Sequence, residues 1–492
     1  MGMYQPVEKR LRRDHLAATA VLSISLAAVL STLGCGNQYR PVVSAIGPVG
    51  PAGQPTKYAV AVSNPSPTSL GLLTIVDFAG DTVLSTPNIL SNPSYFVLNP
   101  NGTQGYTINT EGSLNTFFLS NPTALISSNV VQTTLPVNSL PVSITSLTPA
   151  SALSTIFIPE TDSNSIAAVN AGTAALYDNV GIKGGSNPVY VVGSAGTPRV
   201  YAISQNTPGT NGQIDSLETI STTSLSDSAQ IPVGIKPVYG VMTGDDRRAF
   251  ILNQGSGTVS VINVPSNALD ILPPGVVPAN TPVGIIPIPP IPVAGGGTAA
   301  PNPVWADLSP VSSELVVLNQ GDGIHPGSLS IISIPLCNPS ALTVNPNCSA
   351  TNPVDAAGFG QIIATAIVGI NPSMVSVLQD GTAAYVINEL DGTGNCAAGE
   401  GSVSVVNLQT GQITATICGI SGSTATDVAN ATSNVIFGHP NSVSATTGAP
   451  AGKVYVTSSD SRYMSIIYTD TNTVQAHIPL QGVGLRVLVT NP

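Results

Sequence analysis

Carboxylates and one histidine gather in two glycine-rich stretches of the chain. Asp322 and His325 lie within "NQGDGIHPG", and Glu389, Asp391 and Glu400 lie within "NELDGTGNCAAGE". Carboxylate and backbone carbonyl oxygens are the ligands that calcium prefers. Both stretches connect neighbouring β-type runs at equivalent places, so we expect them to open on one face and to converge on a ligand or a calcium ion. The alternative is that they are solvated turns, because Asp-Gly is common turn chemistry.

Sequence motifs for catalysis are missing. The chain contains no HExxH, no CxxC, no GxSxG and no pair of histidines at metal-ligand spacing. Asn253, Asn319 and Asn388 recur at the ends of β-type runs, and we interpret them as structural loop caps. His439 precedes a proline and is interpreted as a turn residue. Trp305, the single tryptophan, is expected to pack near the centre of the fold.

Composition narrows the classes of fold and partner. Only 8% of the 492 residues are charged and the formal net charge is −11. Lys and Arg total 14, several of them in the first 13 residues, so no basic patch could bind a nucleic-acid backbone. The chain has 48 Gly and 42 Pro between β-branched runs, which indicates all-β structure. A hydrophobic fraction of 42% argues against disorder.

The clearest unit of the chain covers residues 371–420. It contains four β-type runs, at residues 374–378, 383–388, 402–407 and 412–418. Asp380-Gly381 joins the first two runs and Thr410-Gly411 joins the last two. Such pairs tolerate the positive φ of a tight turn, so the four runs are predicted to form an antiparallel sheet.

Similar units recur along residues 55–492. They begin near residues 92, 141, 187, 236, 302, 371 and 439, and an incomplete first unit has runs at 57–63, 72–78 and 82–90. A period of about 45–70 residues with four strands predicts a β-propeller. The first unit lacks a first strand and the tail at 485–489 supplies one, so we expect these two to pair and close the ring. The count is then eight blades, with seven as the alternative.

The repeats resemble the YVTN-type β-propeller family of bacterial and archaeal surface and periplasmic proteins. The naming motif is matched by "YVIN" at 385–388 and "YVTS" at 455–458, and more loosely at 106–109, 250–253 and 316–319. "TVSVIN" and "SVSVVN", at 258–263 and 402–407, match the third-strand pattern. The resemblance implies the fold but no single function, because propellers include enzymes, lectins and scaffolds.

The N-terminus reads as an export signal. Lys9, Arg10, Arg12 and Arg13 precede an apolar run at residues 16–34. The run ends in "TLGCG", which resembles a bacterial lipoprotein signal, although Thr32 stands where that family has Leu. The resemblance implies a signal peptide at 1–34 and a lipidated Cys35, and the Pro- and Gly-rich composition of 35–54 predicts a tether. An uncleaved anchor and an ordinary cleaved signal are the alternatives.

Four further cysteines point to disulfides, because an exported chain meets oxidising conditions. Three pairings are possible, and we expect Cys337–Cys348 within one inserted loop and Cys396–Cys418 within one blade. Free buried thiols are the alternative. The Pro-rich segment 267–301 is expected to be an extended loop.

The function expected from these features is that of a monomeric, lipid-anchored binding or scaffold protein of the cell envelope, either periplasmic or at the cell surface. Its partner would be a protein or a carbohydrate, and no cofactor other than calcium is expected. One alternative is a lactonase-like propeller hydrolase. That alternative is weakened because the first strands are almost wholly apolar or Ser/Thr, with Asp307 a rare exception. A second alternative is a surface adhesion protein.

Overall fold

The computed structural model describes residues 57–490, apart from 67–68, 91, 110, 121–124, 126–128, 148–154, 195–198, 222–223, 274–282, 312, 338–353, 421–437 and 450. The chain divides into two units, Met1–Gln54 and Pro55–Pro492. The predicted signal peptide, Cys35 and the tether lie outside the described residues. Among those that are described, no helix is long and apolar enough to cross a bilayer.

The first four blades account for strands β1 to β15 together with β34. The first blade consists of β1 (Tyr58–Asn64), β2 (Leu72–Asp77), β3 (Val83–Ser85) and the C-terminal β34 (Val483–Val489). The second consists of β4 (Pro93–Leu98), β5 (Gln104–Asn109), β6 (Ser113–Phe118) and β7 (Val131–Thr134). The third consists of β8 (Thr145–Ser146), β9 (Thr155–Glu160), β10 (Ser165–Asn170) and β11 (Ala175–Gly181). The fourth consists of β12 (Pro188–Val192), β13 (Arg199–Ser204), β14 (Asn211–Ser221) and β15 (Ser224–Ile235).

The remaining blades account for strands β16 to β33. The fifth consists of β16 (Pro237–Met242), β17 (Arg248–Asn253), β18 (Thr258–Asn263), β19 (Ala268–Leu269) and β20 (Ile285–Pro287). The sixth consists of β23 (Pro303–Leu308), β24 (Glu314–Asn319), β25 (Pro326–Ser333) and the start of β26 (Gln361–Val377). The seventh consists of the end of β26, β27 (Ala383–Leu390), β28 (Ser402–Asn407) and β29 (Gln412–Ile417). The eighth consists of β30 (Pro440–Thr446), β31 (Lys453–Ser458), β32 (Tyr463–Tyr468) and β33 (Thr473–Pro479).

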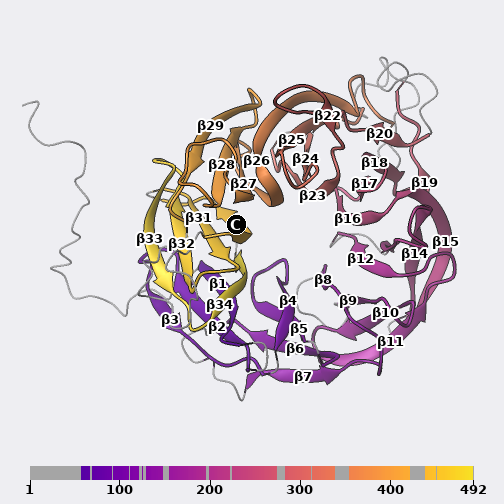
Figure 1. Ribbon diagram of the computed structural model, residues 1–492. Coiled ribbons are helices and arrows are strands. Elements are labelled where there is room, and N and C mark those ends of the chain that lie inside the picture. The colour runs from indigo at the N-terminus through magenta and orange to yellow at the C-terminus, as the bar shows by residue number, and fades with distance from the viewer. Residues whose placement is uncertain are drawn as a thin grey trace, which may run out of the picture. The chain divides into compact units, whose positions relative to one another are not determined.

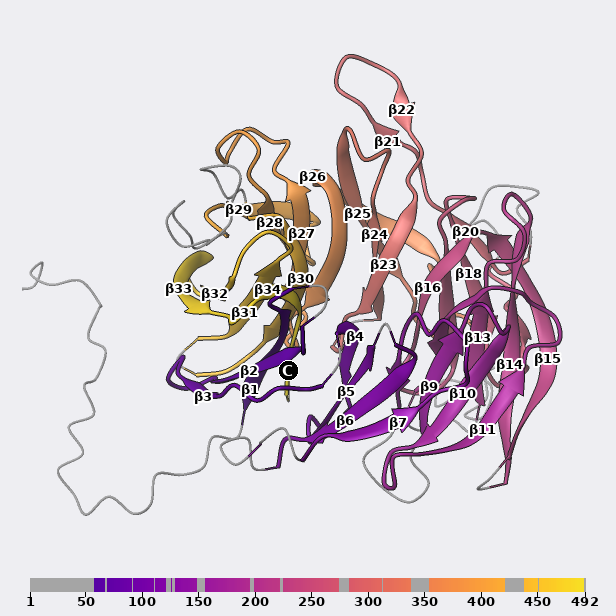
Figure 2. The same ribbon diagram turned by 60° about the horizontal axis from the view of Figure 1, so that its bottom comes forward.

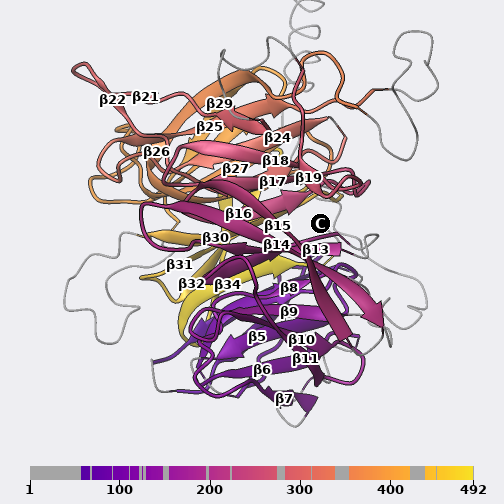
Figure 3. The same ribbon diagram turned by 90° about the vertical axis from the view of Figure 1, so that its right-hand side faces the viewer.

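The described strands therefore make an all-β propeller with eight blades, as the repeats predicted. Figure 1 shows the blades placed around an axis with β4, β12, β16, β23 and β34 on the inner side. Figure 3 shows the sheet of β5–β7 beside the sheet of β9–β11. The sixth and seventh blades share one strand, because residues 361–370 of β26 pair with β25 and residues 370–377 pair with β27.

The C-terminal strand completes the first blade. β34 pairs antiparallel with β1, with Val60 opposite Leu488 and Ala61 opposite Val487. The expected pairing of the tail with the first unit is therefore present. Lys453 of the eighth blade reaches across to the first blade, where its Nζ donates to the Phe78 carbonyl at 2.5 Å and to Asp81 Oδ1 at 2.6 Å.

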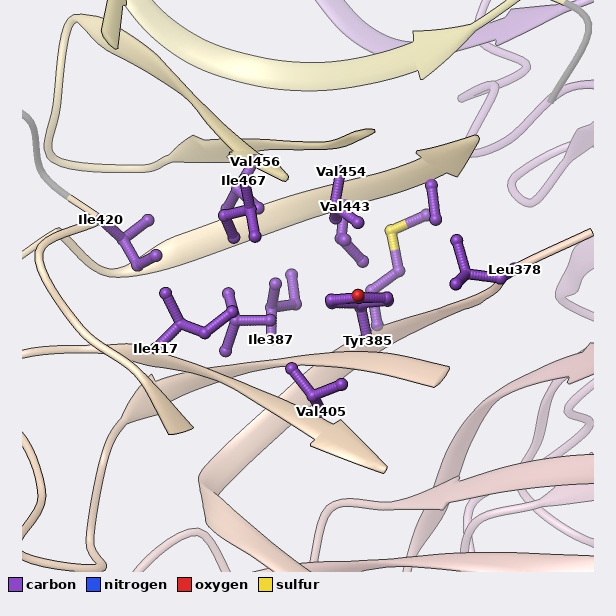
Figure 4. Close-up of a cluster of buried hydrophobic side chains, with 13 residues drawn as sticks. Leu378, Tyr385, Ile387, Val405, Ile417, Ile420, Val443, Val454, Val456 and Ile467 are labelled. Atoms are coloured by element: carbon purple, nitrogen blue, oxygen red, sulfur yellow. The ribbon is translucent and has the colours of Figure 1, made fainter. Parts of the chain in front are cut away.

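Apolar clusters hold the blades together. The second and third strands are buried along nearly their whole length, because each sheet packs on both neighbours. Each of the eight clusters joins one blade to the next, and one of them joins the eighth blade to the first. Figure 4 shows Tyr385 and Ile387 of the seventh blade facing Val454 and Val456 of the eighth. Each fully buried Leu or Ile contributes about 1.5–3 kcal/mol.

A glycine–proline contact recurs between neighbouring blades. The glycine stands at or beside the start of a third strand, and the proline begins the innermost strand of the next blade or, for Pro372, the innermost part of β26. The pairs are Gly212 with Pro237, Gly327 with Pro372 and Gly401 with Pro440. An added Cβ at any of these glycines would lie within 2.6 Å of the proline ring. A side chain at these positions would therefore push neighbouring blades apart.

The segment 267–301 differs from the expected loop. β19 and β20 both pair with β18, so part of this segment forms the interrupted fourth strand of the fifth blade. β21 (Ile291–Pro292) and β22 (Thr298–Ala299) form a hairpin that extends beyond the sheets in Figure 2. A buried ion cluster also ties the insertion of the sixth blade to the fifth, because Arg248 contacts Asp270 at 2.5 Å and Asp355 at 2.9 Å.

Candidate functional site

Seven innermost strands carry the same irregularity, near their start in six and at Pro372–Met374, where the innermost part of the strand begins, in β26. In β4, β12, β16, β23, β26 and β30 the register with the second strand shifts just after the opening proline. In β34 it shifts just before Arg486. A bulge of this kind turns the side chain that follows it. The residues after the shift are Tyr95, Tyr190, Tyr239, Trp305, Met374, Ser442 and Arg486.

Four aromatic rings and one guanidinium from this set form a continuous stack. Tyr239 lies between Tyr190 and Trp305, with ring centroids 4.6 Å and 4.2 Å away. Arg486 lies over Tyr95 at 4.4 Å and over Trp305 at 5.6 Å. All five side chains are half-buried. Stacked rings and cation–π contacts each contribute about 0.5–2 kcal/mol, so this group, which we call the aromatic arc, is rigid.

Asp307 and Arg486 are the only charged residues on the innermost strands that the structure describes. Asp307 Oδ1 accepts from the Leu308 N–H and Oδ2 from the Val377 N–H of the next blade, both at 2.9 Å. Burial raises the pKa of Asp307 to about 6, while the two N–H donors act in the opposite direction. A carboxylate has about four lone-pair positions, so Asp307 keeps acceptor capacity for a ligand.

A cavity of about 310 Å³ lies beside the aromatic arc, along the innermost strands of the third to sixth blades. Tyr190 and Tyr239 form part of its wall, and Asp307 and Thr145 are polar groups on it. The rest of the lining is Leu147, Val191, Val192, Gly193, Gly240, Val241, Met242 and Leu308. Its volume is at the lower end of the range of about 300–1,000 Å³ for small-molecule sites.

Hydroxyl groups take the place of rings in another part of the axis. Ser442 Oγ donates to the Val487 carbonyl at 3.3 Å and is 3.2 Å from the Val487 N–H, and Ser444 Oγ accepts from the Val489 N–H at 3.1 Å. Ser376 Oγ accepts from the Ala445 N–H at 3.0 Å. These three serines, which we call the serine arc, join β26 to β30 and β30 to β34.

The predicted residues of the sixth-blade loop form a local turn. His325 Nδ1 lies 2.7 Å from Asp322 Oδ2, and Asp322 Oδ1 accepts from the N–H groups of Ile324 and His325 at 2.9 Å and 2.8 Å. These bonds, led by the His325 N–H, hold the pKa of Asp322 well below its usual range. The exposed Asp322 carboxylate therefore caps the turn of its own loop.

The predicted carboxylates of the seventh-blade loop are also engaged locally. Asp391 is buried and accepts from the Thr393 hydroxyl at 2.6 Å and the Asn395 N–H at 2.9 Å. Burial alone would raise the pKa of Asp391, but these donors lower it. Glu400 lies 3.3 Å from the N–H of Ala397 in its own loop. Asp391 and Glu400 are therefore bonded within their own loop, as Asp322 is within the sixth-blade loop.

One group in this loop has ligand atoms close enough for a metal. Atoms of Cys396, Glu400 and Cys418 lie within 4.8 Å of one another. Cys396 and Cys418 are joined by a disulfide, so neither offers a thiolate. Within the described part of the chain, the predicted carboxylates form no group of three that could hold an ion.

The expected disulfide within the seventh blade is confirmed, since Cys396 and Cys418 are bonded across 22 positions of sequence. Cys337 is also disulfide-bonded. Cys348 lies outside the described residues, so the pairing Cys337–Cys348 stays a prediction.

Side-chain amides connect three blades on one face. Gln320 Nε2 donates to Asn371 Oδ1 at 2.6 Å, and Gln254 Nε2 lies 3.4 Å from Gln320 Oε1. Asn371 Nδ2 donates in turn to Glu389. A hollow of about 280 Å³ lies here, lined by Lys236, Gln254, Gln320, Asp322, Asn371 and nearby backbone. Asp322 and Glu389 thus reach the same face, but only Asp322 lines the hollow.

The recurring asparagines are structural, as the sequence indicated. Asn253 Nδ2 donates to Ser260 Oγ at 2.9 Å, Asn319 to Ser330 Oγ at 3.0 Å and Asn388 to Ser404 Oγ at 3.0 Å. All three asparagines are fully buried. Each one fastens its second strand to the third.

The axial tyrosines and Arg486 were not identified from the sequence. A signal for the aromatic residues was present, because Tyr95, Tyr190, Tyr239 and Trp305 each follow a proline by two positions. Arg486 has no such proline, and although its strand was expected to complete the first unit, its side chain was not singled out. Trp305 was expected near the axis, and it lies there.

Comparison with known proteins identifies the fold but no family. No protein-family model and no curated protein matches the chain. Among solved structures, the dihydro-heme d1 dehydrogenase NirN in complex with DHE is similar, with a TM-score of 0.56 and 11% identity over 87% of this chain and 74% of that one. Apo AztD from Citrobacter koseri has a TM-score of 0.51 and 9% identity over 88% of this chain and 97% of that one. At these identities the likeness shows a shared β-propeller fold alone.

Proposed function

We propose that this protein is an exported, lipid-anchored propeller of the cell envelope that binds a compact ligand at its axis. The observation that carries the proposal is the axial cavity, in which two tyrosines and a carboxylate lie on an otherwise apolar wall. Such a combination of apolar surface with a few polar groups is typical of ligand sites. The protein acts by binding, without catalysis.

The lining defines the ligand class. Six apolar side chains surround the cavity, so the ligand has an apolar body. Asp307 accepts hydrogen bonds and is the only charged residue in the lining, so the ligand carries a donor, best a primary amine. A sugar is disfavoured, because most of its hydroxyls would meet no polar partner in this lining.

Calorimetric titration with benzylamine tests this class. We expect benzylamine to bind to the wild-type protein, and we expect glucose not to bind. Asp307→Asn should weaken benzylamine binding by about tenfold, because it removes a charge-assisted hydrogen bond. The matched control is Asp322→Asn on an exposed loop, which should bind like wild type. Equal binding by both variants would refute an axial site.

YVTN-type membership and export are parts of the same proposal. The motif residues 385–388 lie in β27 and 455–458 in β31, which are both second strands, so the matches fall at equivalent places. Cys35 provides the membrane anchor. Cys35→Ser should release the mature protein from membranes into the soluble fraction. Unchanged membrane fractionation of that variant would favour an uncleaved anchor helix instead.

A lactonase-like hydrolase is a second candidate, favoured by one observation. Asp307 lies in a cavity with a pKa of about 6, which suits a general base near neutral pH. Hydrolysis of δ-valerolactone that disappears in Asp307→Asn but persists in Asp322→Asn would replace the binding proposal with this one.

A further inference from the structure

A hollow of about 530 Å³ lies between the second and third blades, separate from the axial cavity. The β5–β6 turn and the connection from β7 to β8 form its walls. Its lining residues are Ser94, Asn109, Glu111, Gly112, Thr134, Leu135, Pro136, Val137, Asn138, Ser139, Leu140, Pro141 and Asp162. We call this region the 2–3 corner.

Apolar side chains are exposed around the 2–3 corner. Val137 is 85% exposed and Leu140 is 53% exposed. Val142, directly beyond the lining, is 36% exposed. Single exposed apolar residues are ordinary, but several around one hollow mark an interaction site.

The wall of the 2–3 corner is held in a fixed shape. The Thr161 N–H donates to the Leu140 carbonyl at 3.1 Å, and the Asp162 N–H donates to the Ser139 carbonyl at 3.2 Å. Leu140 has φ +49°, a value that bulky side chains rarely adopt and that surrounding contacts must maintain. A site that is already shaped costs less ordering entropy when it binds.

The polar lining of the 2–3 corner includes two carboxylates and two buried oxygen atoms without partners. Glu111 and Asp162 are its only charged lining residues, so it carries negative charge. Asn109 and Ser139 are each 1% exposed, and Asn109 Oδ1 and Ser139 Oγ have no hydrogen-bond partner among the described atoms. Buried polar atoms without partners are costly, and an occupant with N–H donors would satisfy them.

The equivalent place in the fifth to seventh blades differs. There, Gln254, Gln320 and Asn371 bind one another, and Lys236 supplies positive charge. The 2–3 corner has neither the amide series nor a lysine in its lining. It is therefore the larger and the more acidic of the two, at about 530 Å³ against about 280 Å³.

From these features we infer that the 2–3 corner docks an extended peptide segment of a partner protein, with apolar side chains in the hollow and a Lys or Arg beside them. The apolar rim receives the side chains, and the acceptors receive backbone N–H groups and the cation. The negative charge disfavours nucleic acids and anionic lipid surfaces. This site is independent of the axial ligand and of the proposed function.

The probe is a labelled pentapeptide, acetyl-Lys-Val-Leu-Val-Lys-amide, titrated by fluorescence anisotropy against the full chain. Acetyl-Glu-Val-Leu-Val-Glu-amide is the charge-reversed comparison. We expect the basic peptide to bind at least about tenfold more tightly than the acidic one, with a difference that shrinks as salt is added.

Two variants and a matched control locate the site. Val137→Ser should weaken the basic peptide about threefold to tenfold, and Asp162→Asn about twofold to fivefold. Ile324→Ser is the control, because Ile324 is 73% exposed in the sixth-blade loop and should bind like wild type. Thermal melts should show all three variants folded.

Each other outcome overturns the inference. Equal binding of the two peptides would remove the role of charge. Equal losses in Val137→Ser and Ile324→Ser would show contact with exposed apolar surface in general. Absence of peptide binding to the wild-type chain would remove the site, while benzylamine binding would still stand or fall separately.

Discussion

The aromatic arc and the serine arc both lie on innermost strands, but their side chains make different contacts. In the serine arc, Ser442 binds the backbone of the next innermost strand, at 3.3 Å to the Val487 carbonyl and 3.2 Å to its N–H. In the aromatic arc, Tyr239 contacts Tyr190 and Trp305 ring to ring. The serine hydroxyls join one innermost strand to the backbone of the next. Beside the aromatic rings, by contrast, lies a cavity of about 310 Å³.

The difference separates stability from recognition within one fold. A hydroxyl that bridges two strands uses its hydrogen bonds within the protein rather than for a ligand. A half-buried ring keeps a face or an edge that a ligand can contact. A single carboxylate near the ring can orient that ligand through a hydrogen bond. A repeat protein can therefore fasten the ring with one group of blades and bind with another.

Removing β34 should have the largest effect, because it removes both Arg486 from the aromatic arc and the backbone groups of Val487 and Val489 that bond to Ser442 and Ser444 of the serine arc. Val487 and Val489 are buried, and Leu485 and Leu488 pack against a cluster. Deletion of residues 483–492 should lower the free energy of unfolding by about 5–10 kcal/mol. Deletion of 491–492 alone is the control. If both truncations melt like the full chain, β34 does not hold the ring together.

Tyr239→Ala should come next, because it removes the ring that stacks between Tyr190 and Trp305 in the aromatic arc. The cost should be about 2–4 kcal/mol, below that of a fully buried aromatic residue, since Tyr239 is half-buried. The affinity for benzylamine should also decrease in this variant. Urea unfolding gives the stability, and Tyr239→Phe, which keeps the stack, should cost much less. Similar losses in the two variants would assign the effect to the hydroxyl.

The aromatic arc should also respond to pH. The folded pKa of Asp307 is raised to about 6, so between about pH 4 and pH 6 the folded state binds more protons than the unfolded state. Stability should therefore fall as pH rises through this range, by about 1–2 kcal/mol for this half-buried group. The comparison is wild type against Asp307→Asn in melts across that range. A constant difference between them would contradict the raised pKa.

The serine arc should show the smallest effect per residue. Ser442→Ala removes the hydroxyl that serves Val487, at a cost of about 1 kcal/mol. Benzylamine affinity should not change, because Ser442 does not line the axial cavity. Loss of ligand affinity in this variant would mean that the two arcs are not separate.

Much of the fold was visible in the sequence because each blade is a local unit. The runs at 383–388 and 402–407 needed only neighbouring residues to be recognised, and β27 and β28 begin at those positions. The disulfide Cys396–Cys418 joins strands of one blade and was predictable for the same reason. The unbroken β26 was not expected, because Asn371 and Pro372 read as a break between units.

The candidate site was much less visible, because it is made by residues far apart in sequence. Tyr95 and Arg486 meet only when the C-terminal strand joins the first blade, and no local pattern indicates that contact. Of the carboxylates of the predicted loop site, Asp322, Asp391 and Glu400 lie between strands, whereas Glu389 lies in β27. Their orientation depends on turn N–H donors, such as that of Asn395, which turn Asp391 inward.

The single tryptophan gives the most direct measurement of axial binding. Trp305 stacks on Tyr239, whose side chain lines the cavity, at 4.2 Å. We expect benzylamine to change Trp305 fluorescence saturably at about pH 7.5, and to do so about tenfold more weakly in Asp307→Asn. A fluorescence signal that stays unchanged through saturating benzylamine, or that changes identically in both proteins, would contradict a ligand site at the axis.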